Sequence, residues 1–465
     1  MNNCDTIIYG ASQLVTCASN GKPKRSAEMR NVGMIENGAI AIKNGVIVAV
    51  DSSDEIARDY KAENTIDAKG KVVTPGFVEC HTHIVYAGNR LDEFEMKIKG
   101  ADYLEILASG GGIISTVQKT RETTLGKLVE QSRKRLDKML ALGVTTCEVK
   151  TGYGLNTETE LKMLEAIFEL DDSHAIDLIP TFLPAHAVPP EFKGSADKYV
   201  DLICSKMLVQ AIELFVSREI NFDVIRQENT ENETGVRLDK SGVSFGMYDI
   251  AEFGRSAILR NKPFFVDVFC EKNAFDLEQS RRVLETAKNL GFKLKAHVDE
   301  FTNLGGARMA IELGATSIDH LDCISDEEIA LLAVSETIGV VTPTVNFNFG
   351  SSEFADTRKF IDSGCAIALS TDYNPGSAPC PSLPNAMAIA CRYQKLLPSE
   401  ALNAATINAA FAVGSGEKTG SIEVGKQADI LIIDTEDFRQ IAYEFGGNMI
   451  DKVIKKGETV FSQKK

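Results

Sequence analysis

Eight short apolar runs follow one another along the middle of the chain, and stretches with helical periodicity separate them. The runs cover residues 77–81, 144–149, 176–183, 264–270, 292–297, 315–320, 337–342 and 365–371. Several helix-like stretches end in a glycine just before the next run, as at Leu142-Gly143 and Leu290-Gly291, which is a common helix stop. Eight alternations of strand and helix predict an α/β fold, a (β/α)₈ TIM-like barrel. The alternative is a doubly wound open sheet, but its dinucleotide fingerprint G-x-G-x-x-G is absent.

The two ends of the chain are rich in β-branched residues and poor in helical periodicity. Near the N-terminus, Asn44-Gly45 separates two such runs, which is a strong signal for a β-hairpin. We therefore expect residues 1–74 and 419–465 to form one small β-sandwich domain, with the barrel of residues 75–418 inserted between them. Within the barrel, residues 214–262 form an insertion. Its sequence is compatible with a lid over the site, with a protein interface and with a surface loop that has no function.

The composition limits the classes of partner. The 465 residues are enough for a barrel plus a smaller domain, and the net charge of −16 disfavours nucleic acid and anionic membranes as partners. No apolar run is long enough to span a bilayer, and the N-terminus lacks the basic and apolar regions of a signal peptide. The ten cysteines show no C-x-x-C pair or regular spacing, which favours reduced thiols in a cytoplasmic enzyme.

Five of the six histidines stand at the ends of predicted strands, and one aspartate joins them. These residues are His81 and His83 after strand one, His186 after strand three, His297 at strand five, His320 at strand six and Asp372 at strand eight. The carboxyl ends of barrel strands face one pocket, so we expect the six side chains to converge. Any one of the histidines, taken singly, is more often a core residue. The sixth, His174, lies elsewhere and is expected on the surface.

Three imidazoles and a carboxylate are a suitable ligand set for Zn²⁺ or Fe²⁺. A metal held in this way keeps a position for water and lowers the pKa of that water from about 15.7 to about 7. The reaction class that follows is hydrolysis at a carbonyl or amidine-like carbon.

The same residues carry a family resemblance. His81-Thr82-His83, His297, His320 and Asp372, each at its strand end, resemble the amidohydrolase superfamily, and so does the small β domain built from both termini. The resemblance implies His81, His83, His297 and Asp372 as metal ligands. Binuclear members bridge two metals with a lysine of strand four, whereas strand four here ends in Cys270-Glu271 with Lys272 one step later. We therefore expect one Zn²⁺ or one Fe²⁺/Fe³⁺ per chain.

The chain also contains finer motifs, which are Ala87-Gly88-Asn89-Arg90, Tyr103-Leu104-Glu105, Lys150-Thr151-Gly152-Tyr153, Ala185-His186-Ala187 and Thr371-Asp372-Tyr373-Asn374-Pro375-Gly376-Ser377. These motifs resemble one branch of that superfamily, the enzymes that open an imidazolone ring in histidine degradation. The resemblance covers nearly the whole chain and lapses at residues 214–262. It implies hydrolysis of 4-imidazolone-5-propanoate, a small molecule, to N-formimidoyl-L-glutamate, and it implies a homodimer.

The resemblance also implies which side chains contact the substrate. They are Arg90, Tyr103, Tyr153, His186, Glu300, Asn374, Gly376 and Ser377. Arg90 offers a bidentate fork to the propanoate; the alternative is an ion pair with Asp92 or Glu93. Tyr153 could instead be a packed aromatic, and the Asn374 turn could serve turn formation alone.

The catalytic roles are expected to fall on three residues. Water activated by the metal attacks the ring carbonyl, and His320 accepts the proton or stabilises the oxyanion. Asp372 shares the proton role. Glu300 contacts a ring nitrogen and returns the proton to the leaving nitrogen, unless it is only an ion-pair residue.

Two other functions compete with this hypothesis. One is a different cyclic-amide hydrolase or deaminase of the same superfamily acting on a small anionic ring. The other is a catalytically inactive barrel used as an interaction scaffold, although such proteins usually lose metal ligands, and all four stand here.

Overall fold

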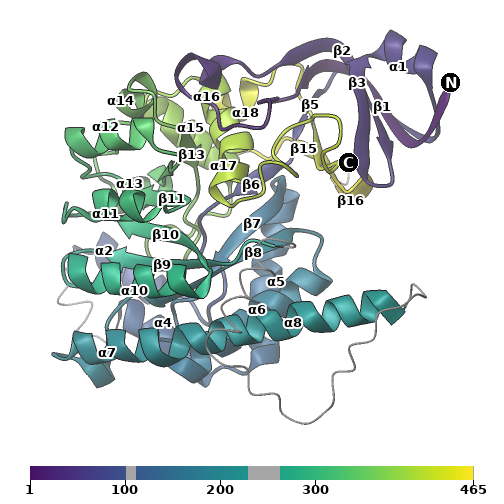
Figure 1. The fold of residues 1–465 in the computed structure, drawn as a ribbon. Coiled ribbons are helices and arrows are strands. Elements are labelled where there is room, and N and C mark those ends of the chain that lie inside the picture. The colour runs from purple at the N-terminus through teal and green to yellow at the C-terminus, as the bar shows by residue number, and fades with distance from the viewer. Residues whose placement is uncertain (101–110, 229–261, 464–465) are drawn as a thin grey trace.

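The computed structural model describes residues 1–100, 111–228 and 262–463, and its centre is a parallel sheet of eight strands that curls into a barrel (Figure 1). The strands are β6 (Phe77–Glu79), β7 (Val144–Lys150), β8 (Asp177–Ala185), β9 (Phe265–Cys270), β10 (Lys293–Val298), β11 (Ser317–His320), β12 (Ile338–Val341) and β13 (Ile367–Leu369). Each strand pairs in parallel with the next one in the chain. All eight predicted strands are confirmed, and so is the barrel.

The barrel closes where the first and last strands meet. Thr82 and Tyr373 form a parallel bridge, and the amide of His83 donates to the carbonyl of Tyr373 at 3.0 Å. Below this bridge the buried carboxylate of Glu79 accepts hydrogen bonds from the hydroxyls of Ser370 and Thr371. The strand that carries the two-histidine motif is therefore fixed against the strand that leads to Asp372.

Helices surround the strands because the intervening segments are amphipathic and well capped. In α10, for example, Asp276 forms a capping box with Gln279, and Gly291 ends the helix in the left-handed conformation. The barrel helices are α2 (Leu91–Ile98), α4 (Ile113–Glu122), α5 (Leu125–Ala141), α6 (Thr157–Ser173), α7 (Ala196–Leu202), α8 (Leu208–Glu228), α10 (Leu277–Leu290), α11 (Gly306–Leu313), α12 (Asp326–Val334), α13 (Pro343–Phe349), α14 (Thr357–Asp362), α15 (Leu383–Tyr393), α16 (Pro398–Ala404) and α17 (Ile407–Ala412).

Both chain ends contribute to a second sheet, and the N and C labels lie close together in Figure 1. Its strands are β1 (Asn2–Val15), β2 (Met34–Lys43), β3 (Val46–Ser52), β4 (Tyr60–Asp67), β5 (Val72–Pro75), β14 (Ile430–Ile433), β15 (Ile450–Lys455) and β16 (Glu458–Ser462). The predicted hairpin is confirmed: β2 and β3 join at Asn44 and Gly45, which both have positive φ. Side chains from β1, β2, β14 and β15 pack into one apolar cluster. The two short helices of this part are α1 (Ser53–Asp59) and α18 (Gln440–Tyr443).

The predicted insertion begins inside α8, a long helix that crosses the lower part of Figure 1. Residues 196–216 are helical and comprise α7, a π-helical turn over Ile203–Met207 and the first part of α8. Residues 229–261 of the insertion lie outside the described residues. Among the described helices, none combines the length and the apolar character that a membrane span requires.

Candidate active site

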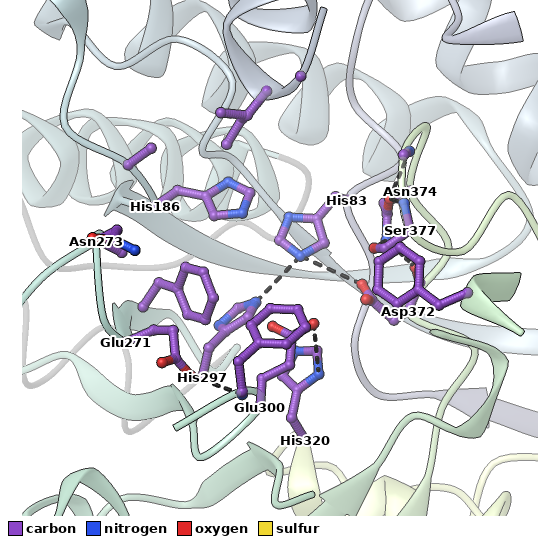
Figure 2. A pocket seen from close by; sticks show the side chains of 18 of the residues that line it. His83, His186, Glu271, Asn273, His297, Glu300, His320, Asp372, Asn374 and Ser377 are labelled. Atoms are coloured by element: carbon purple, nitrogen blue, oxygen red, sulfur yellow. Dashed lines mark hydrogen bonds and ion pairs between the residues drawn. The ribbon is translucent and has the colours of Figure 1, made fainter. Parts of the chain in front are cut away.

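A cavity of about 560 Å³ opens at the carboxyl ends of the barrel strands, which is a usual size for a small-molecule site. Figure 2 shows His83, His186, His297, His320 and Asp372 pointing into it from different strands. The structure therefore shows the predicted convergence of these side chains at the carboxyl ends of the barrel strands.

Five side chains form a compact cluster at the bottom of the cavity. The nitrogens of His81, His83 and His297 that could hold a metal all lie within 4.8 Å of one another, and the same holds for those of His81 and His320 with an oxygen of Asp372. Nε2 of His297 is 3.3 Å from Nε2 of His83. Oδ1 of Asp372 lies 3.5 Å from Nε2 of His81 and 3.6 Å from Nε2 of His83.

The chemistry of this donor set fits a metal ion. Nε2 of His81, Nε2 of His320 and Oδ1 of Asp372 are buried, and no hydrogen-bond partner reaches them within the described part of the chain. Such atoms are costly to bury unless something binds them. Burial lowers the pKa of His81 and of His320 well below the ordinary value, so both rings are neutral and can offer a lone pair. Burial also raises the pKa of Asp372 well above its ordinary value, an effect that a nearby cation would oppose.

Buried carboxylates hold the far side of two of these rings. Nδ1 of His81 lies 2.6 Å from Oδ2 of Asp319, and Nδ1 of His297 lies 3.0 Å from Oδ2 of Asp267. The hydrogen bond between Nδ1 of His81 and Asp319 keeps the proton on Nδ1 and leaves Nε2 free for a metal, whereas Asp267 faces Nδ1 of His297 at ion-pair distance without an aligned hydrogen bond. The sequence reasoning missed Asp267 and Asp319. For Asp267 the available signal was a charged residue inside an otherwise apolar strand.

Two site residues lie on strained backbone. His320 has φ of +86° and Asp372 has φ of +49°, a region that residues other than glycine rarely adopt. Strain of this kind persists where the surrounding structure imposes it, and it is frequent at functional sites. Nδ1 of His320 contacts Oγ1 of Thr342 at 3.1 Å and Oε1 of Glu300 at 3.9 Å.

Arg90 reaches the opposite wall of the cavity from the start of α2. Its Nε donates to Oγ1 of Thr116 at 2.9 Å, and Oε1 of Glu93 is 3.9 Å away. The guanidinium also lies against Gly376, where a Cβ atom would come within 2.2 Å of Nη1. The side chain is only 12% exposed, and it forms an ion pair with Glu93, as the alternative expected, while it also lines the cavity.

The turn after Asp372 lines the same wall. The amide oxygen of Asn374 accepts from the backbone N–H groups of Gly376 and Ser377 at 2.8 Å, and its nitrogen donates to Oγ of Ser377. The Asn374 side chain therefore builds the turn, as the turn-formation alternative expected, while all three residues also line the cavity.

Tyr153 and His186 stand together above the histidine cluster. The ring of His186 stacks on that of His83 with centroids 4.8 Å apart, and the Tyr153 ring lies 5.4 Å from that of His186. Nδ1 of His186 lies 3.0 Å from the carbonyl oxygen of Gly152. Burial lowers the pKa of His186 to about 3, so the ring is neutral, Nδ1 carries the proton and Nε2 is an acceptor.

Two further residues named from the sequence, Tyr103 and His174, do not line the described cavity. Tyr103 lies outside the described residues. The expected surface position of His174 is wrong: its side chain is 4% exposed, its Nε2 lies 3.3 Å from Oδ1 of Asp137, and its Nδ1 accepts from the amide of Ile176. The ring is used to end α6, which explains its burial away from the cavity.

The cavity also contains side chains to which the sequence assigned no role in the site. They are Glu93, Lys97, Phe269, Glu271, Phe301 and Phe349. Nζ of Lys97 lies 5.3 Å from the centre of the Phe349 ring, and Phe301 contacts the same ring. No motif marked them, because they lie on α2, β9, α13 and the loops after β9 and β10, which only the fold brings together.

Comparison with known proteins places the chain among amidohydrolases. The amidohydrolase family model matches residues 273–460. The chain is 48% identical over 460 residues to the imidazolonepropionase of Chloroflexus aggregans, with 99% of each chain covered. It is 44% identical to the imidazolonepropionase of Herpetosiphon aurantiacus, covering 99% of this chain and 98% of the other. Identity to that of Geobacillus kaustophilus is 43%, with 98% of each covered.

Solved structures share the fold at lower identity. An adenosine deaminase from Xanthomonas campestris with bound zinc has a TM-score of 0.67 at 18% identity, covering 99% of this chain and 94% of that one. The guanine deaminase of E. coli has a TM-score of 0.64 at 15% identity, covering 99% of both chains. At these identities the likeness establishes the fold alone.

Proposed function

The chain belongs to the imidazolonepropionase family within the amidohydrolase superfamily and is a hydrolase; from that premise we propose how its cavity opens the ring of 4-imidazolone-5-propanoate to give N-formimidoyl-L-glutamate. The proposal rests on one observation: a cluster of potential metal ligands and an arginine lie in the same cavity. The cluster of His81, His83, His297 and Asp372 lies at its bottom, and Arg90 lies in its wall. This arrangement suits a substrate with a hydrolysable ring at one end and a carboxylate at the other.

We propose that His81, His83, His297 and Asp372 hold one metal ion, Zn²⁺ or Fe²⁺/Fe³⁺. When bound, the ion would act as a Lewis acid and lower the pKa of a coordinated water to about 7, which makes hydroxide available at neutral pH. The neutral imidazoles and the orphaned Asp372 oxygen support this assignment.

The substrate is oriented by groups that already have defined hydrogen-bonding directions. The guanidinium of Arg90 forms a paired contact with the propanoate. Nε2 of His186, an acceptor, receives an N–H of the ring, and Tyr153 adds its hydroxyl. The remaining substrate contacts in this proposal are made by Tyr103, Asn374, Gly376 and Ser377.

Proton transfer falls to His320 and Glu300. His320 takes the proton of the attacking water at Nε2, the ring nitrogen that no described residue engages. Asp372 shares this role. Burial and the nearby charge of Asp372 raise the pKa of Glu300 well above its ordinary value, which favours the protonated carboxyl. Glu300 then donates that proton to the leaving ring nitrogen.

The function is tested by an assay on metal-reconstituted protein. Loss of the ultraviolet absorbance of 4-imidazolone-5-propanoate, with N-formimidoyl-L-glutamate as product, is the expected result. Removing the metal with a chelator should abolish it, and adding Zn²⁺ or Fe²⁺ back should restore it. Cytosine and guanine serve as controls; turnover of either in place of the imidazolone would contradict the proposal.

His320→Ala separates proton transfer from metal binding. We expect the variant to retain one metal per chain by elemental analysis but to lose about 10²–10⁴-fold in kcat, the range typical of a lost general base. Glu300→Gln should keep its metal and lose turnover too, since the amide has no proton to give. A kcat near that of the unmodified enzyme in His320→Ala would remove His320 from this role.

We propose further that the enzyme acts in the cytoplasm as a homodimer. The scattered cysteines, all free in the described residues, support a reducing compartment. Light scattering coupled to size-exclusion chromatography would distinguish a dimer from the 50.6 kDa monomer.

A further inference from the structure

A layer of buried charges lies directly beneath the histidine cluster. It consists of Glu148 and Lys150 on β7, Asp267 on β9 and Asp319 on β11, and each of these four side chains is fully buried. We call these four residues the charged layer. Burying a charged group lowers the stability of a protein unless the group is paired and hydrogen-bonded. The contacts of these four side chains therefore indicate why they are buried here.

Each carboxylate of the layer contacts a different part of the metal-binding set. Asp319 lies 2.6 Å from Nδ1 of His81, and Asp267 lies 3.0 Å from Nδ1 of His297. Glu148 accepts the backbone N–H of Thr82, the residue between His81 and His83, at 3.1 Å. Asp267 also accepts the backbone N–H of His297 at 3.2 Å, so the three carboxylates together contact two metal-binding histidines and the peptide that carries the two-histidine motif.

Lys150 joins the three carboxylates to one another. Its Nζ lies 2.7 Å from Oε1 of Glu148, 2.7 Å from Oδ2 of Asp267 and 3.8 Å from Oδ2 of Asp319. Burial lowers the pKa of Lys150, but these carboxylates outweigh the burial and raise it above the ordinary value. The side chain of Lys150 is therefore held as a cation among the three carboxyl groups.

A second lysine close by has different contacts. Nζ of Lys295 lies 3.7 Å from Asp319, but its hydrogen bonds go to Oγ of Ser317 and to the carbonyls of Cys80 and Ala412. No ion pair recorded for the described residues connects Lys295 to Asp267 or Glu148. The link from one carboxylate to the next therefore runs through Lys150.

We propose that Lys150 is the positioning residue of the metal centre: by holding Asp267, Asp319 and Glu148, it sets the orientation of His297, His81 and the His81–His83 segment. Lys150 contacts neither the metal nor the substrate. It acts because a ring whose Nδ1 is fixed by a carboxylate directs its Nε2 lone pair to one point, and outer partners of this kind set metal affinity. The inference rests on the metal site of the proposed function.

Lys150→Met tests the proposal, since it keeps the length of the side chain and removes the charge and the donors. We expect the dissociation constant for Zn²⁺, measured by competition with a chromophoric chelator, to rise about tenfold or more. We also expect the visible absorption bands of the Co²⁺-substituted protein to shift, because these bands report the geometry of the ligands. Both measurements are made without substrate.

Lys455→Met is a matched control. Lys455 is also buried and also lies 2.7 Å from each of two carboxylates, those of Asp177 and Asp429, but it belongs to the terminal sheet. Its loss should lower the melting temperature and leave the Zn²⁺ affinity and the Co²⁺ spectrum unchanged. If Lys150→Met binds both metals as the unmodified protein does, or if Lys455→Met weakens binding equally, the positioning role is wrong.

Lys150→Gln is the second variant if Lys150→Met does not fold. It retains a donor near the carboxylates but no charge, and the same rise in the Zn²⁺ dissociation constant is expected. An unchanged affinity there overturns the proposal. Absence of any Zn²⁺ binding in the unmodified protein would instead remove the metal site itself, whereas metal binding without ring opening would contradict only the proposed reaction.

Discussion

At the scale of single residues, Gly376 shows how a missing side chain can define a binding site. A Cβ atom at this position would come within 2.2 Å of Nη1 and 2.9 Å of Cζ of Arg90. Because the obstructed group is the end of a flexible side chain, Arg90 can move away at little cost in stability. It would then leave the place from which we propose that it binds the propanoate.

Gly376→Ala should therefore raise KM about tenfold or more and change kcat little, because a hydrogen bond to a charged group contributes about 1.5–3 kcal/mol. Steady-state kinetics and a melting curve check this. Gly126→Ala, in α5 where a Cβ would meet no neighbour within 4 Å, is the control and should leave KM unchanged. An unaltered KM in Gly376→Ala would mean that Arg90 does not bind the substrate from its present position.

The sequence could predict those site residues whose amino-acid type is rare in this chain and which stand at the end of a predicted strand. Histidine is scarce in this chain, so five at strand ends stood out; the structure brings four of them to one cavity and places the fully buried His81 against His83 and His297. Asp267, Asp319 and Lys150 could not be assigned in the same way. Their role depends on distances across the barrel between β7, β9 and β11, which a linear sequence does not contain.

At the scale of elements, α6 holds the loop that presents Tyr153. The buried carboxylate of Glu160 accepts from the backbone N–H groups of Gly152, Gly154 and Leu155 at 2.7–3.0 Å. The carbonyl of Gly152 in turn engages Nδ1 of His186. One helix side chain thus fixes a loop and, through it, two groups that line the cavity.

Glu160→Gln keeps the shape of this side chain but turns one acceptor into a donor that faces N–H groups. We expect kcat/KM to fall about tenfold or more, since small displacements of positioning groups are costly, and the free energy of unfolding to fall by about 1–3 kcal/mol. Glu165→Gln, at an exposed position on the same helix, is the control. Lower stability with unchanged kcat/KM would show that the loop does not position substrate-binding groups.

The strands and helices themselves were largely predictable, because apolar runs, helix periodicity and glycine stops are local signals. The observed ends of the strands differ from the predicted ones by only a few residues. The run predicted at 77–81, for example, forms a strand over Phe77–Glu79. The closure of the barrel was not predictable from local signals. It depends on the Thr82–Tyr373 bridge and on Glu79, whose partners are about 290 residues away in the chain. The proposed domain boundaries at residues 74 and 419 stay a prediction.

At the scale of the whole molecule, an ionic contact joins the barrel to the terminal sheet. Asp177, the first residue of β8, lies 2.7 Å from Nζ of Lys455 on β15 and 2.9 Å from Nζ of Lys456. Lys455 also pairs with Asp429, just before β14. Burial alone would raise the pKa of Asp177, but Lys455, Lys456 and Gln427 hold it well below its ordinary value.

This contact predicts how stability depends on pH. A carboxylate whose pKa is lower in the folded than in the unfolded protein stabilises the fold above its unfolded pKa of about 3.9, and this stabilisation is lost as the pH falls through the folded pKa. Asp177→Asn has no such contribution. The free energy of unfolding should therefore be lower in the variant by about 2 kcal/mol at neutral pH, and the difference should shrink below about pH 4.

Urea unfolding of both proteins between about pH 7 and pH 3, with chelator present so that metal release does not contribute, measures this difference. Glu63→Gln, which removes an exposed carboxylate on β4, should leave the curves almost superimposed at every pH. A gap between Asp177→Asn and the unmodified protein that stays constant, or widens toward acid, would show that Asp177 is not ionised in this contact. The barrel and the terminal sheet would then be held together by their apolar packing rather than by this charge.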